Sequence, residues 1–182
     1  AIMGSNPSLF ITVTDGPVEQ VTWFNAIEYC NRRSMIESLT PCYSYGTYGT
    51  NPSNWPEGWN AAEGNHTNVS CNWSAKGYRL PTEGEWYYAA LGGNQTHNYM
   101  YSGSNTIDDV AWYSGNSLSS THPIGSKAAN ELGLYDMTGN VSEWAWDIYA
   151  ILPIEAQTNP HGPTTGTNRC IRGANWSTNA YY

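Results

Sequence analysis

Charged residues, and basic ones above all, are scarce in this sequence. Asp, Glu, Lys and Arg make up 12% of its 182 residues, with 7 Lys and Arg against 15 Asp and Glu and a formal net charge of −8. Soluble domains usually carry about twice that fraction, roughly 25%. An acidic chain repels phosphate groups, so we expect neither nucleic-acid binding through a basic face nor a polybasic contact with a membrane.

Long apolar runs and short catalytic motifs are missing as well. The best apolar stretch, 145–154, is short and is interrupted by Asp147 and Pro153, so it cannot span a membrane. The sequence has no H-E-x-x-H, Walker A, G-x-G-x-x-G or G-x-S-x-G motif. We therefore expect no transmembrane segment in this chain and none of the enzyme classes that those motifs mark.

The 4 cysteines contain no C-x-x-C pair, which excludes the common metal and redox motifs of that spacing. Cys42 and Cys71 fall in short segments that alternate like strands, which leaves open a cross-strand disulfide or two free thiols. Cys30 falls on the apolar face of a predicted helix, where a small buried hydrophobe is the favoured interpretation.

Phenylalanine is nearly absent, with 2 Phe, whereas the chain has 14 Tyr and 9 Trp. Tyr and Trp join an apolar ring to a polar group. Together with Asn, Ser and Gly they are typical of binding surfaces, because the rings give rigid contacts and the small polar residues adapt. The long polar loop 46–67 contains Trp55 and Trp59, which we expect either to pack on the domain or to form part of a contact surface.

Two helices are predicted from apolar spacing and capping residues. The first runs from about Thr22, a suitable N-cap, to Glu37. The second begins at Thr82, which forms a capping box with Glu85, and ends before a Gly-Gly pair. Short strands are expected at 69–73, 78–80, 110–113, 141–146 and 169–176.

A cluster of oxygen-bearing side chains lies between residues 134 and 144. Asp136, Asn140 and Glu143 stand close together around Gly139, which permits a tight turn. Carboxylate and backbone carbonyl oxygens on a turn suit calcium. Taken alone, the pattern fits an ordinary turn with solvated acids equally well.

Six segments carry distinctive motifs, in order and over nearly the whole chain: 17–23, 77–86, 110–113, 121–125, 133–144 and 172–176. The most specific are Tyr-Arg-Leu-Pro-Thr-Glu (78–83) and Gly-Leu-Tyr-Asp-Met-x-Gly-Asn-Val (133–141). Together they resemble the formylglycine-generating-enzyme (sulfatase-modifying factor) family. The resemblance implies an α+β chain with the C-type lectin fold of that family: two helices, short antiparallel strands and much irregular structure. We expect a single domain, 1–182, that is incomplete at both ends.

The resemblance also implies a structural calcium ion, because the family binds calcium at its glycine-asparagine-valine turn. The ligands here would be Asp136, the carbonyl oxygens of Gly139 and Val141, and Glu143. The family often has Asn where this chain has Asp136, so an oxygen ligand is retained at that position.

The catalytic chemistry of the family fits this chain poorly. Catalytic members oxidise a substrate cysteine with copper held by two active-site cysteines. By alignment on 173–175, the first would fall near Thr178 and the second beyond Tyr182, while Cys170 precedes the motif. We therefore predict no catalytic residue and a non-enzymatic role. A copper-dependent oxidase of protein cysteine is the alternative.

The C-terminal segment resembles the variable proteins of bacterial diversity-generating retroelements, which share this fold and carry Asn, Tyr, Ser, Thr and Asp at diversified surface positions. This implies a ligand-binding protein for an unknown protein or surface ligand, at the bacterial cell surface or in the periplasm. An ordinary final strand and loop, in a family member of unknown or purely structural role, is the alternative. The predicted contact residues are Asn175, Trp176, Ser177, Thr178, Asn179, Tyr181 and Tyr182.

Overall fold

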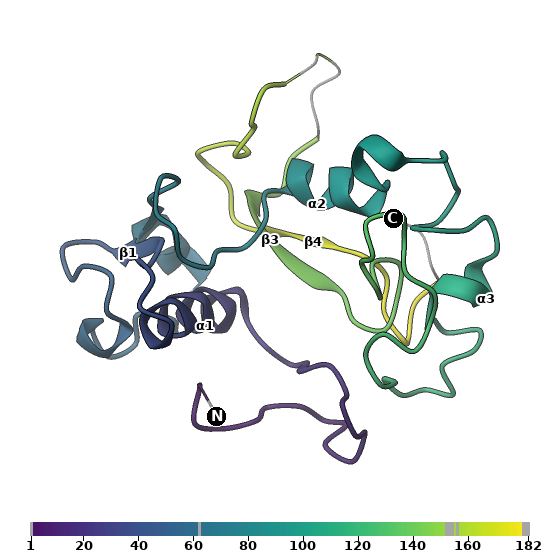
Figure 1. Cartoon of the computed structure of the whole chain (residues 1–182). Helices are drawn as coiled ribbons and strands as arrows, with labels where there is room; N and C mark the ends of the chain where they lie inside the picture. Colours follow the sequence, from purple (N-terminus) through teal and green to yellow (C-terminus); the bar gives the residue numbers. More distant parts are fainter. Residues whose placement is uncertain (1, 62, 152–154, 156, 180–182) are drawn as a thin grey trace.

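The computed structural model describes the whole chain except residues 1, 62, 152–154, 156 and 180–182. Short regular elements alternate with long irregular segments (Figure 1). The helices are α1 (Trp23–Ile36), α2 (Glu83–Ala90) and α3 (Ile107–Val110), with 3-10 turns η1 (Pro52–Asn54), η2 (Glu63–Asn68) and η3 (Gly93–Gln95), and the strands are β1 (Tyr43–Tyr45), β2 (Val69–Cys71), β3 (Glu143–Ile148) and β4 (Arg169–Arg172).

Both predicted helices are present and begin at their predicted caps. Thr22 Oγ1 accepts a hydrogen bond from the Asn25 N–H at 3.1 Å, and Asn25 Oδ1 accepts one from the Thr22 N–H at 2.9 Å. At α2, Thr82 Oγ1 accepts a hydrogen bond from the Glu85 N–H, and Glu85 Oε2 accepts one from the Thr82 N–H. Arg79 donates to both oxygens of the Glu85 carboxylate, which fixes the cap of α2 in place.

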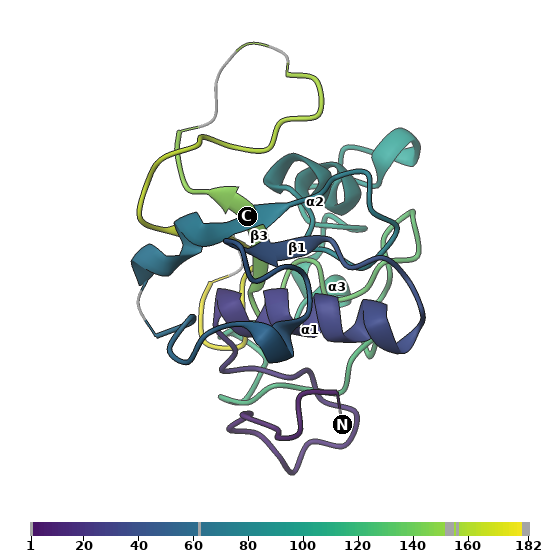
Figure 2. The same ribbon diagram turned by 90° about the vertical axis from the view of Figure 1, so that its left-hand side faces the viewer.

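The strands form two antiparallel pairs. β1 pairs with β2, and β3 pairs with β4 with a bulge between Trp144 and Ile148. In Figures 1 and 2, α1 and the β1–β2 pair lie on one side of the β3–β4 pair, and α2 and α3 lie on the other. The irregular segments cross between these elements and bring distant parts of the sequence together.

Two of the predicted strands are wrong, because their backbone groups bond to other partners. At 78–80, the Tyr78 N–H donates to Ser34 Oγ at 2.8 Å and the Leu80 N–H donates to Tyr43 Oη at 2.7 Å. The apolar run 110–113 begins as the end of α3 and continues as irregular chain.

The long loop 46–67 packs on the domain, and the prediction that its tryptophans could form a contact surface is wrong. Trp55 and Trp59 are both buried, with ring centroids 4.4 Å apart. Trp59 lies edge-on to Phe24 of α1 and to Tyr45 of β1. They belong to the main core, which contains Trp23, Phe24, Ile27, Cys30, Cys42, Tyr43, Tyr45, Trp55, Trp59 and Val69.

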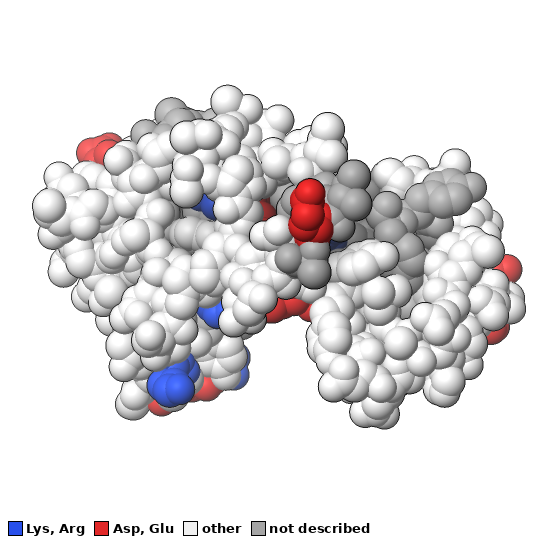
Figure 3. Space-filling view, turned by 90° about the horizontal axis from the view of Figure 1, so that it is seen from above, with Lys and Arg blue, Asp and Glu red and all other residues white. Residues whose placement is uncertain are grey.

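The surface reflects the low charge of the sequence. Seen from above, few Lys, Arg, Asp and Glu side chains are visible among uncharged ones (Figure 3). Within the described part of the chain, no helix has the length and apolar character needed to cross a membrane.

Candidate functional site

The predicted calcium-binding turn, residues 136–143, contains two residues with an uncommon left-handed backbone. Asp136 and Asn140 adopt φ angles of 60° and 67°, a left-handed conformation that Asn and Asp tolerate better than most residues. A Cβ atom on Gly139 would lie 2.5 Å from the carbonyl oxygen of Trp112, so only glycine fits there. The turn therefore depends on Asp136 and Asn140 for its left-handed backbone and on glycine at 139 for its close approach to Trp112.

Asn140 holds the turn from inside and is not available as a ligand. Its side chain is fully buried. Its Oδ1 accepts from the His122 N–H at 3.0 Å, and its Nδ2 donates to the His122 carbonyl at 3.0 Å. The turn is thus tied to the segment before it by a reciprocal pair of bonds.

Asp136 and Glu143 both border a cavity of about 460 Å³. Asp136 Oδ2 accepts from the Gly125 N–H at 2.8 Å, whereas its buried Oδ1 has no hydrogen-bond partner. Glu143 Oε2 accepts from Trp86 Nε1 at 2.6 Å. The unpartnered buried oxygen beside a second carboxylate is an arrangement that a bound cation would satisfy.

The pKa shifts of Asp136 and Glu143 are those expected of two acids that a bound cation would stabilise. Burial raises the pKa of Asp136. Burial also raises the pKa of Glu143, and the charge of Asp136 adds to the effect, while the hydrogen bond from Trp86 opposes it. Among the residues that the structure describes, no group of three or more His, Cys, Asp and Glu side chains could hold a metal. A calcium site here would therefore need the predicted carbonyl ligands of Gly139 and Val141.

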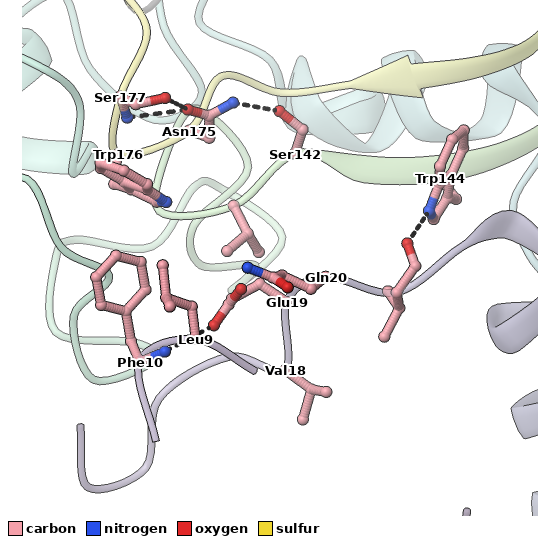
Figure 4. A pocket seen from close by; sticks show the side chains of 12 residues that line it. Leu9, Phe10, Val18, Glu19, Gln20, Ser142, Trp144, Asn175, Trp176 and Ser177 are labelled. Carbon is pink, nitrogen blue, oxygen red and sulfur yellow. Dashed lines mark hydrogen bonds between the residues drawn. The ribbon is translucent and has the colours of Figure 1, made fainter. Parts of the chain in front are cut away.

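A second cavity, of about 280 Å³, lies between the predicted contact residues and the N-terminal segment, residues 8–21 (Figure 4). Asn175, Trp176 and Ser177 line one side, and Leu9, Phe10 and Glu19 line the other. The Trp176 and Phe10 rings meet edge to face at 5.1 Å. The structure thus brings three of the predicted contact residues together at a cavity.

The remaining predicted contact residues continue the same surface. Thr178 and Asn179 are exposed, as is Ser177. The Thr178 carbonyl accepts from the Ser114 N–H at 3.0 Å, and Asn179 Oδ1 accepts from Ser114 Oγ at 3.2 Å. Tyr181 and Tyr182 lie outside the described residues. We call the described residues 175–179 the C-terminal surface.

The N-terminal wall of this cavity is the part that sequence reasoning missed. The Phe10 N–H donates to Glu19 Oε1 at 2.9 Å, and the Glu19 N–H donates to Ser8 Oγ at 3.2 Å. These bonds fold the segment back on itself and point its acid toward the cavity. Nothing local in the sequence connects residues 8–19 to residues 175–177.

The cysteines offer no reactive pair in this structure. All four are free thiols, and β1 and β2 pair so that Tyr43, not Cys42, stands opposite Cys71. Burial raises the pKa of Cys30 and of Cys71 to about 12 each, and that of Cys170 to about 11. Thiols with such pKa values are poor nucleophiles and poor metal ligands at neutral pH.

The fold built from these elements is that of the sulfatase-modifying factor family. The model of the sulfatase-modifying factor enzyme 1-like domain matches residues 4–182, and the chain belongs to that family. The predicted family and the predicted C-type lectin-type fold are thereby confirmed.

Three similar proteins show how far the likeness extends along this chain and along theirs. The solved structure of Treponema denticola variable protein 1 superposes with a TM-score of 0.83 at 35% identity, over 98% of this chain and 69% of that one. The "Chaperone protein LppX" of Paenibacillus barcinonensis is 43% identical over 96% of this chain and 64% of that protein. The formylglycine-generating enzyme of Mus musculus is 31% identical over 62% of this chain and 33% of that enzyme. The chain thus spans less than two thirds of the length of these two sequence relatives.

Proposed function

We propose that this chain is a non-catalytic ligand-binding protein that presents its C-terminal surface, with Tyr181 and Tyr182, on a rigid C-type lectin scaffold. The observation that carries the proposal is the similarity to a variable protein of Treponema denticola over 98% of the chain. Its partner would be a protein or a surface ligand, met at the bacterial cell surface or in the periplasm.

The way the C-terminal surface is attached supports this role. Its backbone is fixed: the Trp176 N–H donates to the Asn140 carbonyl at 3.0 Å, and the Trp176 carbonyl accepts from Ser117 Oγ at 2.6 Å. The side chains of Ser177, Thr178 and Asn179 are exposed. A surface whose backbone is held by other segments can change its side chains at little cost to the fold.

The binding test compares two triple variants of the full-length protein. Replacement of Ser177, Thr178 and Asn179 by Ala should weaken binding to an isolated partner at least tenfold, because contact surfaces concentrate their energy in a few residues. The control replaces three exposed residues of another loop, Ser53, Asn54 and Glu57, by Ala. Calorimetric titration measures affinity, and thermal melting confirms that both variants fold. Equal affinity of the two triple variants would refute the proposal.

The copper-dependent oxidase remains the alternative, favoured by the 31% identity to the mouse formylglycine-generating enzyme. It requires oxidation of cysteine peptides by the copper-loaded protein. The high thiol pKa values and the exposed Thr178 at the expected cysteine position argue against it.

We also propose a structural calcium ion held by Asp136, the carbonyl oxygens of Gly139 and Val141, and Glu143. Calcium prefers such oxygen ligands, and the unpartnered Asp136 Oδ1 is the observation that supports the site. The ion would neutralise two half-buried acids, Asp136 and Glu143, and fix the turn that carries the Asn140 carbonyl. Since that carbonyl holds Trp176, the ion would also stiffen the C-terminal surface.

Calcium should therefore stabilise the protein. At a concentration one hundred times its dissociation constant, calcium should raise the free energy of unfolding by about 2.7 kcal/mol, and EDTA should reverse the gain. Asp136→Asn should abolish the response, which differential scanning calorimetry measures. The effect should weaken as the pH falls through the raised pKa values of Asp136 and Glu143, because protons compete with the metal.

The matched control is Asp15→Asn, because Asp15 has the same left-handed backbone, with φ at 54°, but does not line the cavity. This variant should respond to calcium like the wild type. A wild-type protein whose melting temperature ignores both calcium and EDTA would rule out the ion.

A further inference from the structure

The cavity at the C-terminal surface has the dimensions of a side-chain pocket. Its volume of about 280 Å³ is just below the roughly 300–1,000 Å³ of small-molecule sites. It lies between the N-terminal segment and residues 175–177 (Figure 4), and it is open to solvent. One long side chain of a bound partner could enter it.

A single acid sets the charge of this pocket. Glu19 is the one charged side chain among the described residues that line it. Its Oε1 accepts a hydrogen bond from the Phe10 N–H, and a carboxylate can accept about four hydrogen bonds. The carboxylate is half-buried and held by its backbone, so it meets a ligand in a fixed position and partly shielded from solvent.

Aromatic rings form the walls beside this acid. Phe10 and Trp176 are both partly exposed and meet edge to face, and Trp144 closes another side. Aromatic faces attract cationic side chains, and arginine makes such contacts more often than lysine does. The Trp144 Nε1 already donates to the Val21 carbonyl, and Ser177 Oγ already donates to Asn175 Oδ1. The donors of Trp144 and Ser177 are thus used internally, while acceptor capacity remains at Glu19 and the exposed Gln20.

We propose that this pocket receives a cationic side chain of the partner, and arginine in preference to lysine. Arginine presents five N–H donors in a planar group that both stacks on aromatic rings and pairs with a carboxylate. The net charge of −8 favours the approach of a cationic partner. This assignment rests on the proposed function, since Trp176 and Ser177 belong to the C-terminal surface.

The test uses two single-residue probes of equal shape. N-acetyl-arginine amide carries a guanidinium, and N-acetyl-citrulline amide carries a neutral urea in its place. They are titrated into the ¹⁵N-labelled, calcium-saturated protein. We expect saturable shifts of the Trp144 and Trp176 indole N–H signals and of the Phe10 amide, with the citrulline probe at least fivefold weaker. The lysine derivative should bind less tightly than the arginine derivative.

A pair of variants isolates the carboxylate. Glu19→Gln keeps an acceptor for the Phe10 N–H but removes the charge, and should weaken the arginine probe at least threefold. Glu57→Gln, an exposed acid outside the pocket, should change nothing. The spectrum of each variant reports whether it folds.

Three outcomes would overturn the assignment: equal binding of the arginine and citrulline probes, shifts confined to the turn at 136–143, or no effect of Glu19→Gln. Failure here is distinct from failure of the proposed function. If partner binding is lost in the triple variant of 177–179 but unchanged in Glu19→Gln, the C-terminal surface binds the partner and the arginine assignment is wrong.

Discussion

Arg172→Leu should destabilise the protein by about 3–5 kcal/mol, the range for breaking a buried ion pair by removing one partner. Arg172, at the end of β4, forms an ion pair with Glu83 at the start of α2. Glu83 is only 3% exposed. Without Arg172, the Glu83 carboxylate retains the hydrogen bond from the Cys170 thiol at 3.3 Å, and a thiol is a weak donor. Chemical denaturation at neutral pH, with the slope compared between variants, measures the loss.

The control is Arg32→Leu, which removes an ion pair from the surface of α1. Arg32 pairs with Glu28 at 2.7 Å, and its side chain is 34% exposed. Helical pairs of this kind contribute about 0.3–0.5 kcal/mol. A double replacement, Glu83→Leu with Arg172→Leu, should recover part of the stability, because no buried charge is left alone. Equal losses in Arg172→Leu and Arg32→Leu would show that the buried pair contributes no more than a surface pair.

Helices α1 and α2 could be predicted from the sequence because their signals are local. Thr82 and Glu85 lie three residues apart, and their capping bonds form wherever α2 begins. Strand 78–80 was predicted from a similar local pattern and was wrong. Its N–H groups bond to Ser34 Oγ and Tyr43 Oη, side chains about 40 residues away, and no local pattern contains such partners.

The same distinction separates the two candidate sites. The turn at 136–143 was found because its acids, glycine and asparagine are adjacent in the sequence, and the structure places Asp136 and Glu143 around one cavity. The pocket beside it depends on Phe10 meeting Trp176. That contact joins the two ends of the described chain, and only the folded backbone brings them together.

Asn31→Ala should destabilise the protein by about 4 kcal/mol. Asn31 is fully buried in α1. Its Nδ2 donates to the carbonyls of Tyr43 at 2.7 Å and Thr50 at 2.8 Å, and its Oδ1 accepts from the Tyr43 N–H at 3.1 Å. Each buried group that loses its partner costs about 1–3 kcal/mol. Alanine leaves two such groups unpaired, the N–H and the carbonyl of Tyr43, together with the carbonyl of the exposed Thr50. Denaturant unfolding measures the change.

The effect of Asn31→Ala should extend beyond α1, because Tyr43 connects α1 to the segment that leads into α2. Its Oη accepts from the Leu80 N–H, just before the α2 cap. Hydrogen exchange of the Tyr43 and Leu80 amides should therefore accelerate together in Asn31→Ala. The same substitution six residues earlier, Asn25→Ala, removes the two hydrogen bonds that Asn25 Oδ1 accepts from the α1 cap residue Thr22. It should cost about 1 kcal/mol without accelerating exchange at Leu80. If both variants lose the same stability, Asn31 does not join these elements.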